Sequence, residues 1–276
     1  MFPTVQFLNV QIPTFFLTLS VVSVLVLFLI QNRARHWYRN FFWLPDDFVK
    51  TVWSLTLWIL IGSFIGGRLG HVLIEEPRYY LAMPERVFAF WMGGFVFFGG
   101  FFLAVAFSTG FLLWKKTPQP LIYFDFFAPV VSLSYVLGRI GCFLNGCCYG
   151  KVCDLPWDIS MADAQGLVYS RHPTQLYSAA WELGLFLFLY FWQKPKFFYL
   201  FRAESLRARE IGSLFVVWLF FHSLGRFILE FWRDDFRGPE FLLTPSGWIS
   251  LCLMVICLFV HPQAPARIGR RRNTSM

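Results

Sequence analysis

Residues 121–144 read LIYFDFFAPVVSLSYVLGRIGCFL, an almost continuous apolar run that holds two charged residues, Asp125 and Arg139. A helix needs about 20 residues to cross the hydrocarbon core of a bilayer, so this run is long enough to span one. The whole chain of 276 residues agrees, because 57% of it is hydrophobic, 21% aromatic and only 14% charged. Soluble domains are typically about 45–50% apolar and about 25% charged. The sequence therefore predicts an integral membrane protein and excludes disordered, collagen-like and disulfide-scaffold chains.

Apolar runs of similar length recur along the chain. There are seven in all, and the others lie near residues 14–31, 51–74, 87–114, 174–193, 211–231 and 246–261. We therefore expect an all-α integral membrane protein with seven transmembrane helices. Residues 1–276 are expected to form a single transmembrane domain. Within it, residues 145–173 are predicted to be an ordered outer loop with little helix, and a short basic cytoplasmic tail begins at about residue 262.

The distribution of basic residues predicts the orientation of the chain. Most of the 24 Lys and Arg residues fall on one side of the expected spans, in residues 33–50, 115–116, 194–209 and 267–272. Cytoplasmic loops carry such an excess, so the N-terminus is expected outside and the C-terminus in the cytoplasm. This placement accounts for the net charge of +8, so we expect no nucleic-acid partner. Arg33 is the first basic residue, so the first run is expected to be a permanent span and not a cleaved signal peptide.

Six ionisable residues fall within the expected spans. Each costs roughly 2.5–3.5 kcal/mol to insert at bilayer depth, so such residues indicate function unless they are paired. Three of them are arginines, expected at one level about 8 Å below the outer interface at 1.5 Å of helix per residue. A layer of planar guanidinium groups suits a phosphate at head-group depth. The six residues are Arg68, Asp125, Arg139, Glu182, Arg226 and Glu230.

Helical spacing predicts two polar faces that point into the bundle. His222, Arg226 and Glu230 lie at i, i+4 and i+8, with Gly225 beside them to admit a close neighbour. The alternative for Arg226 and Glu230 is mutual neutralisation at the surface. A second face follows residues 121–144 at i, i+3, i+7 and i+10, and consists of Ser132, Tyr135, Arg139 and Cys142.

Glycines and cysteines gather near the same end of the expected bundle. Glycines between residues 66 and 150 favour close helix packing, and those beside the arginines would also let a backbone N–H approach a ligand. Four of the six cysteines lie at residues 142–153 without a C-x-x-C spacing, and the nearest histidine, His172, is in the next segment. We therefore expect no metal site. Inert thiols are the expected state, and a disulfide on the oxidising side is the alternative.

These motifs together resemble a known family. Residues 138–150, GRIGCFLNGCCYG, are similar to the signature G-R-x-G-N-F-x-N-x-E-x-x-G of the bacterial prolipoprotein diacylglyceryl transferases. Further segments agree in order and spacing, and the resemblance covers roughly residues 14–260. These segments are GGRLG at 66–70, GGFVFFGG at 93–100, DFFAP at 125–129, RHPTQLY at 171–177 and GRFILEFWR at 225–233.

The resemblance implies a transferase of the bacterial cytoplasmic (inner) membrane. Its members pass the diacylglyceryl group of phosphatidylglycerol to the lipobox cysteine thiol in the signal peptide of a preprolipoprotein, and glycerol phosphate leaves. No cofactor is implied. The attacking sulfur must be a thiolate, and it comes from the substrate, so none of the chain's own cysteines needs to be the nucleophile. The predicted catalytic residues are Arg139, Arg226 and His222, and the predicted substrate-binding residues are Arg139, Asn145, Gly150, Arg68, Glu230 and His172.

The chain departs from the family at four positions that bear on which residue acts as the general base in catalysis. Cys142 and Cys147 stand where the signature has Asn and Glu, Phe98 replaces a histidine, and His222 replaces a tyrosine. His222 is then a better base candidate than His172, because it lies one helical turn from Arg226. The alternatives are a mechanism in which the arginines alone lower the pKa of the substrate thiol, and a non-catalytic lipid-binding or lipid-moving protein.

Overall fold

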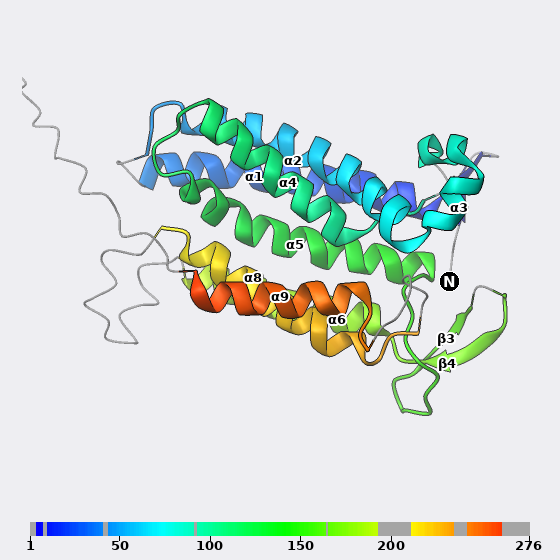
Figure 1. Cartoon of the computed structure of the whole chain (residues 1–276). Helices are drawn as coiled ribbons and strands as arrows, with labels where there is room; N and C mark the ends of the chain where they lie inside the picture. The colour runs from blue at the N-terminus through cyan, green and yellow to red at the C-terminus, as the bar shows by residue number, and fades with distance from the viewer. Residues whose placement is uncertain are drawn as a thin grey trace, which may run out of the picture.

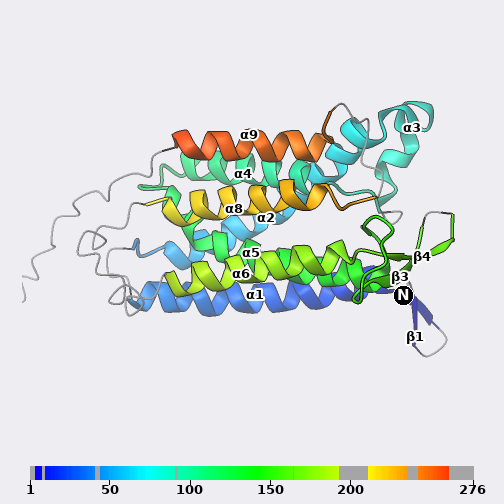
Figure 2. The same cartoon turned by 90° about the horizontal axis from the view of Figure 1, so that it is seen from below.

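The computed structural model describes residues 4–7, 10–40, 44–90, 93–163, 165–192, 211–234 and 242–260. Long helices lie side by side in a bundle, as both views show (Figures 1 and 2). They are α1 (Thr14–Asn40), α2 (Phe48–Gly70), α4 (Phe97–Trp114), α5 (Leu121–Asn145), α6 (Thr174–Trp192), α8 (Ser213–Glu230) and α9 (Pro245–Phe259). The predicted basic segments near 194–209 and beyond 262 lie outside the described residues.

Short elements collect at one end of the bundle (Figure 1). A π-helical turn, η1 (His71–Glu75), continues α2 and leads to α3 (Pro77–Ala82) and the 3₁₀ helix η2 (Pro84–Phe88). Two antiparallel hairpins add strands to the expected all-α fold, namely β1 (Thr4–Phe7) with β2 (Val10–Pro13), and β3 (Ile159–Ala162) with β4 (Val168–Arg171). The described part of the 145–173 segment contains this second hairpin and no helix.

The described residues form a helical membrane protein. Five segments are long and apolar enough to cross a bilayer: Leu17–Arg39, Phe48–Glu75, Phe97–Trp114, Leu121–Asn145 and Ser213–Glu230. The other two predicted spans correspond to α6 and to the shorter apolar helix α9. Helices therefore form at all seven predicted positions, and five of them meet the length and apolarity that a crossing requires.

The predicted span at 87–114 is too long. Its helix, α4, begins only at Phe97, because Gly93 and Gly94 have φ of 80° and 78° and so interrupt any helix. Glycine is favoured at Gly94, because its φ strains other residues and a Cβ there would contact the ring of His71. Residues 93–96 are not helical and pack against the end of α2, where Val96 N–H donates to Gly67 O at 3.0 Å.

Small residues set the distance between α2 and α4. A Cβ on Gly66 would lie 2.3 Å from the carbonyl oxygen of Gly99, and a Cβ on Gly99 would lie 2.4 Å from the carbonyl oxygen of Gly66. The two backbones are thus in direct contact, as in other small-residue interfaces of membrane helices. The predicted packing role of these glycines is confirmed.

One buried charge fixes the position of α8 against α5. The carboxylate of Asp125 accepts hydrogen bonds from the backbone N–H groups of Gly212 (2.7 Å) and Phe215 (3.0 Å) at the start of α8. These donors have no partner within their own helix, and the positive end of the helix dipole favours the carboxylate. Asp125 is therefore a structural cap for α8. Its charge is compensated within the protein, so this one of the six ionisable residues needs no ligand.

The α2–α4 contact supplies the first test. Replacing Gly66 by Ala should lower the free energy of unfolding by about 1–3 kcal/mol, the usual cost of overpacking, because the Gly99 backbone cannot move aside cheaply. Gly110→Ala on α4 is the matched control, since a Cβ there meets nothing within 4 Å. Unfolding in detergent measures both variants, and equal stability of the two would contradict the proposed backbone contact.

Candidate active site

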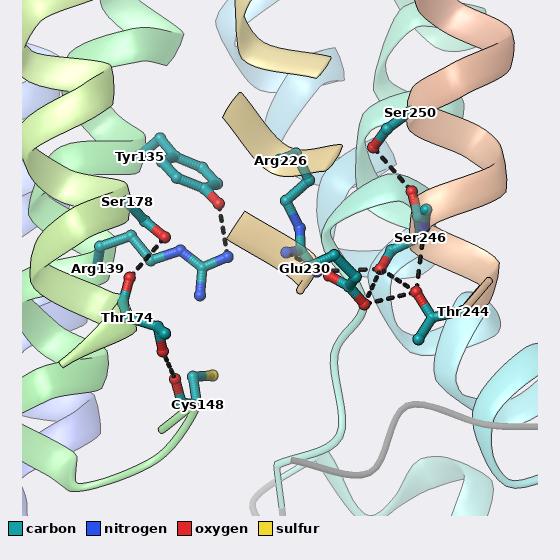
Figure 3. A network of polar contacts seen from close by, with 11 residues as sticks. Tyr135, Arg139, Cys148, Thr174, Ser178, Arg226, Glu230, Thr244, Ser246 and Ser250 are labelled. Atoms are coloured by element: carbon teal, nitrogen blue, oxygen red, sulfur yellow. Dashed lines mark hydrogen bonds and ion pairs between the residues drawn. The ribbon is translucent and has the colours of Figure 1, made fainter. Parts of the chain in front are cut away.

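Arg139 is the central residue of the candidate site. Arg139 lies near the end of α5 and is 9% exposed, and its side chain extends toward α8 (Figure 3). Its Nη2 donates to Oη of Tyr135 at 2.6 Å, and its guanidinium lies 4.7 Å from the centre of the same ring. Within the described chain Tyr135 is the only hydrogen-bond partner of this guanidinium. Most of its five N–H donors are therefore available to a ligand.

Tyr135 connects Arg139 to His222. The two rings meet edge-on with centroids 4.9 Å apart, and Phe97 and Trp218 enclose the imidazole from other sides. Nδ1 of His222 lies 3.0 Å from a carboxylate oxygen of Glu182, whose other oxygen accepts from Trp218 Nε1 at 2.8 Å. His222 is only 2% exposed, and its Nε2 has no hydrogen-bond partner among the described residues.

Arg226 and Glu230 form an ion pair within the bundle. Nη1 of Arg226 lies 2.6 Å from Glu230 Oε2, and both side chains are less than a tenth exposed, so the pair does not snorkel to the surface. Ser246 and Thr244 at the start of α9 donate to Glu230 Oε1 at 2.9 and 2.5 Å, and Arg226 Nη2 donates to Ser246 at 3.0 Å (Figure 3). These contacts fix the direction of Arg226.

Arg68 does not join the other two arginines. Its guanidinium donates to the carbonyl oxygens of Arg86, Val87, Ala89, Gly93 and Gly94, at distances from 2.5 to 3.4 Å. With three N–H-bearing nitrogens all engaged, Arg68 holds the segment between α2 and α4 in place. The predicted lipid contact of Arg68 is therefore corrected, since backbone carbonyls take up its donors.

The segment after α5 returns to the bundle through Gly150. Its N–H donates to the carbonyl oxygen of His172 at 3.0 Å, and a Cβ there would lie 2.7 Å from the same carbonyl. Gly150 also pairs with Arg233 in an isolated β-bridge, which ties this segment to the end of α8. Glycine is thus required at Gly150 so that its backbone can approach that of His172 closely. The sequence alone could not distinguish this role from the predicted contact with a ligand.

His172 and Asn145 lie at the two ends of this segment. Nδ1 of His172 lies 3.3 Å from Oη of Tyr177, and Trp157 donates to the same oxygen at 2.9 Å, so His172 orders the start of α6. Asn145 is the last residue of α5 and is half-buried. Within the described chain no residue hydrogen-bonds to its side-chain amide, which leaves it available to a ligand.

Two further arginines, which the sequence assigned only to outer loops, are buried near the site. Arg171 is 4% exposed and binds Asp234 at 2.5 Å and Gly150 O at 3.2 Å. Arg233 is 6% exposed and lies three residues after Glu230. Neither is within an apolar run, so hydropathy gave no indication that these two arginines are buried. Their burial comes from the tertiary structure, in which β-bridges pair Arg233 with Gly150 and Arg171 with Val152.

The cysteines of this end are free thiols, and three of them lie together. Sγ atoms of Cys142, Cys147 and Cys148 are all within 4.8 Å of one another. Hydrogen bonds from the Cys142 and Cys147 thiols, followed by the charges of Arg233 and Arg139, hold the pKa of Cys148 well below its usual range. The structure therefore gathers sulfur and positive charge at one place.

The fold and these residues define a class of protein. It is a multi-helix membrane protein in which two buried arginines, Arg139 and Arg226, extend from neighbouring helices near one end of the bundle (Figure 3). The chain belongs to the prolipoprotein diacylglyceryl transferase family, whose sequence profile matches residues 3–261.

Several curated relatives share this family. The chain is 39% identical over 196 residues to the phosphatidylglycerol–prolipoprotein diacylglyceryl transferase of Nitrosomonas europaea. The matched residues make up 70% of this chain and 66% of that protein. It is 35% identical over 221 residues to the enzyme of the same name from Geobacter sulfurreducens (76% and 78%). It is 33% identical over 258 residues to that of Paraburkholderia phymatum (83% and 80%).

Proposed function

We propose that this protein transfers the diacylglyceryl group of phosphatidylglycerol to the lipobox cysteine thiol of preprolipoproteins, in the bacterial cytoplasmic membrane. The single observation that carries the proposal is the buried guanidinium of Arg139, which has one described hydrogen bond. An isolated buried cation is costly, and an anionic lipid phosphate would compensate it. A lipid phosphate reaches this depth only from the membrane, and the family relatives are named for the same lipid.

The two arginines have different roles in this proposal. Arg139 binds the phosphate of the lipid through its free N–H donors and stabilises the negative charge that grows on the departing glycerol phosphate. Arg226 is already paired with Glu230. The part of its positive charge that Glu230 does not neutralise acts on the same phosphate. Asn145 offers an uncommitted amide at the end of α5 to the head group. Fixed donors in a dry site are worth more than the same donors in water, because they need no reorganisation.

We assign His222 a positioning role in place of the predicted role as a base. Its ring is 2% exposed and enclosed by three aromatic rings, so a substrate thiol cannot reach it without moving them. Glu182 fixes the imidazole, the imidazole fixes Tyr135, and Tyr135 accepts from Arg139. His222 therefore acts on catalysis by orienting Arg139, and the thiolate of the substrate has another origin.

The same proposal includes seven spans with the N-terminus outside. The charge distribution supports it, as does the presence of helices at all seven predicted positions. This orientation places the β3–β4 hairpin and Arg139 on the outer side, where exported preprolipoproteins present their lipobox.

The role of Arg139 is tested by two substitutions. Arg139→Lys keeps the charge but loses the planar fork, so transfer should fall about 100-fold, the usual loss for a removed transition-state donor. Arg139→Ala should reduce transfer to background. Arg78→Ala, an exposed residue, is the control and should be fully active. Turnover of phosphatidylglycerol is measured in membranes, and unchanged turnover by Arg139→Ala would remove this residue from the mechanism and favour a non-catalytic lipid-binding protein.

The role of His222 is tested by its pH dependence. His222→Gln should lower turnover by about 10- to 100-fold through misplacement of Arg139, and by the same factor at every pH. Glu182→Gln should give the same profile, because an amide has one acceptor oxygen and cannot accept from both Trp218 and His222. If His222 were a base, the loss would diminish as pH rises and the substrate thiol ionises unaided. A loss relieved at high pH would restore the base assignment.

The orientation is tested by labelling introduced cysteines. A membrane-impermeant thiol probe should label Gln165→Cys, at the exposed tip of the β3–β4 hairpin, in intact spheroplasts. It should label Pro118→Cys, between α4 and α5, only after lysis. Labelling is compared with that of the wild-type chain, which carries its own thiols. The reverse pattern would overturn both the orientation and the outer-leaflet site.

A further inference from the structure

Three thiols converge beside Arg139 at the end of α5. They belong to Cys142, Cys147 and Cys148, and their sulfur atoms all lie within 4.8 Å of one another. All three residues are half-buried, and none is joined in a disulfide. The sequence spacing had argued against a metal site, because it offers no C-x-x-C motif. The structure nevertheless brings the three sulfur atoms together through a turn.

The backbone after α5 produces this convergence. Gly146 ends the helix with φ of 77°, and the chain then folds back so that Cys147 N–H donates to the carbonyl oxygen of Cys142 at 3.1 Å. Cys148 follows with φ of 63°, a left-handed conformation that a cysteine adopts at some cost. The turn therefore directs two consecutive thiols toward the one on the last turn of the helix.

Residues of α6 hold this turn in place. Gln175 Nε2 donates to the carbonyl oxygen of Cys147 at 2.6 Å, and Thr174 Oγ1 donates to that of Cys148 at 2.9 Å. Gln175 and Thr174 are themselves fully buried. The three thiols thus lie on a fixed scaffold, which is what a preorganised ligand set requires.

Three cysteine sulfurs are the ligand set of a thiophilic divalent ion. Zinc takes four ligands, and a catalytic zinc site has three from the protein and an open fourth position for water or substrate. Three thiolates and one Zn²⁺ carry a net charge of −1, and the charges of Arg139 and Arg233 act on Cys148 from nearby. Positive charge is therefore present to balance the complex.

We infer that Cys142, Cys147 and Cys148 bind Zn²⁺ and that its open fourth position takes the cysteine thiol of the lipoprotein substrate. This inference rests on the proposed transferase function and deepens it. It accounts for the source of the substrate thiolate, which the enclosed His222 does not supply. It also places that sulfur next to Arg139, where the lipid phosphate binds.

The transfer step then balances without any change of oxidation state. The substrate thiol releases its proton to solvent when its sulfur binds Zn²⁺, because a coordinated thiol is deprotonated. A sulfur lone pair attacks the glycerol carbon that bears the phosphate ester, so that a carbon–sulfur bond forms and the carbon–oxygen bond breaks. The electron pair of that bond leaves with the oxygen of glycerol phosphate. The thioether product is a weak ligand and dissociates from the zinc.

Covalent transfer through one of the protein's own cysteines is a poorer account of the cluster. Such a step would leave the diacylglyceryl group on the enzyme as a thioether. A second thiol does not displace a thiolate from a saturated carbon at a useful rate, so the group would stay there.

Metal content gives the first test. Wild-type protein purified in detergent without chelators should contain about one zinc ion per chain, measured by elemental (inductively coupled plasma) mass spectrometry. Cys147→Ser and Cys148→Ser should each lose it, and Cys153→Ser, outside the cluster, should retain it. Replacement of zinc by Co²⁺ should give a sulfur-to-cobalt charge-transfer band in the wild type and in Cys153→Ser only. Thermal unfolding of each variant shows that the fold is intact.

Transfer activity gives the second test. Chelator-treated wild type should lose at least 100-fold in transfer and regain it with added Zn²⁺, a factor on the scale of catalytic activation of the nucleophile. Full transfer by metal-free protein, copper in place of zinc, or a disulfide among these three cysteines in active protein would each overturn the zinc inference and leave the proposed function standing. Stoichiometric zinc on these thiols with no transfer by the wild type would overturn the proposed function and leave the metal site standing.

Discussion

A charged side chain in an apolar helical bundle must be compensated by hydrogen bonds or by opposite charge, and this constraint organises the whole structure. Asp125 is compensated by the N-terminus of α8, Glu182 by His222 and Trp218, and Arg68 by backbone carbonyls. The contacts of Asp125 and Glu182 join helices that are distant in sequence, and those of Arg68 join α2 to the residues that precede α4. The buried charges therefore fix how the helices are arranged, and apolar packing alone would leave that arrangement less well defined.

Arg139 departs from this pattern and for that reason marks the site. Its neighbours position it, through the chain from Glu182 to His222 to Tyr135, without using most of its donors. Arg226 is likewise held in direction by Glu230 and the start of α9. A rigid, incompletely satisfied cation at the end of a membrane bundle is suited to an anionic lipid, because a lipid phosphate would supply the missing partner.

Two of the residues that differ from the family signature lie in one cluster. Cys142 and Cys147 replace Asn and Glu of that signature, and the structure adds Cys148 to the same cluster. Phe98, in place of a histidine, is buried at 3% exposure on α4. The thiol cluster therefore changes the chemistry beside Arg139.

The sequence by itself determined the class of fold and predicted a role for Arg139, because apolar runs and a charge within them follow directly from the cost of inserting polar groups in lipid. It also placed Gly66 and Gly99 at a helix interface. Only the tertiary structure decided which charges are already satisfied: Arg68 and Arg226 look alike in sequence, yet backbone carbonyls engage one and a carboxylate directs the other. Likewise the spacing of the cysteines gave no metal motif, since their convergence depends on a left-handed turn and on hydrogen bonds from α6. Contacts between distant segments set these outcomes, and hydropathy and periodicity carry no record of them.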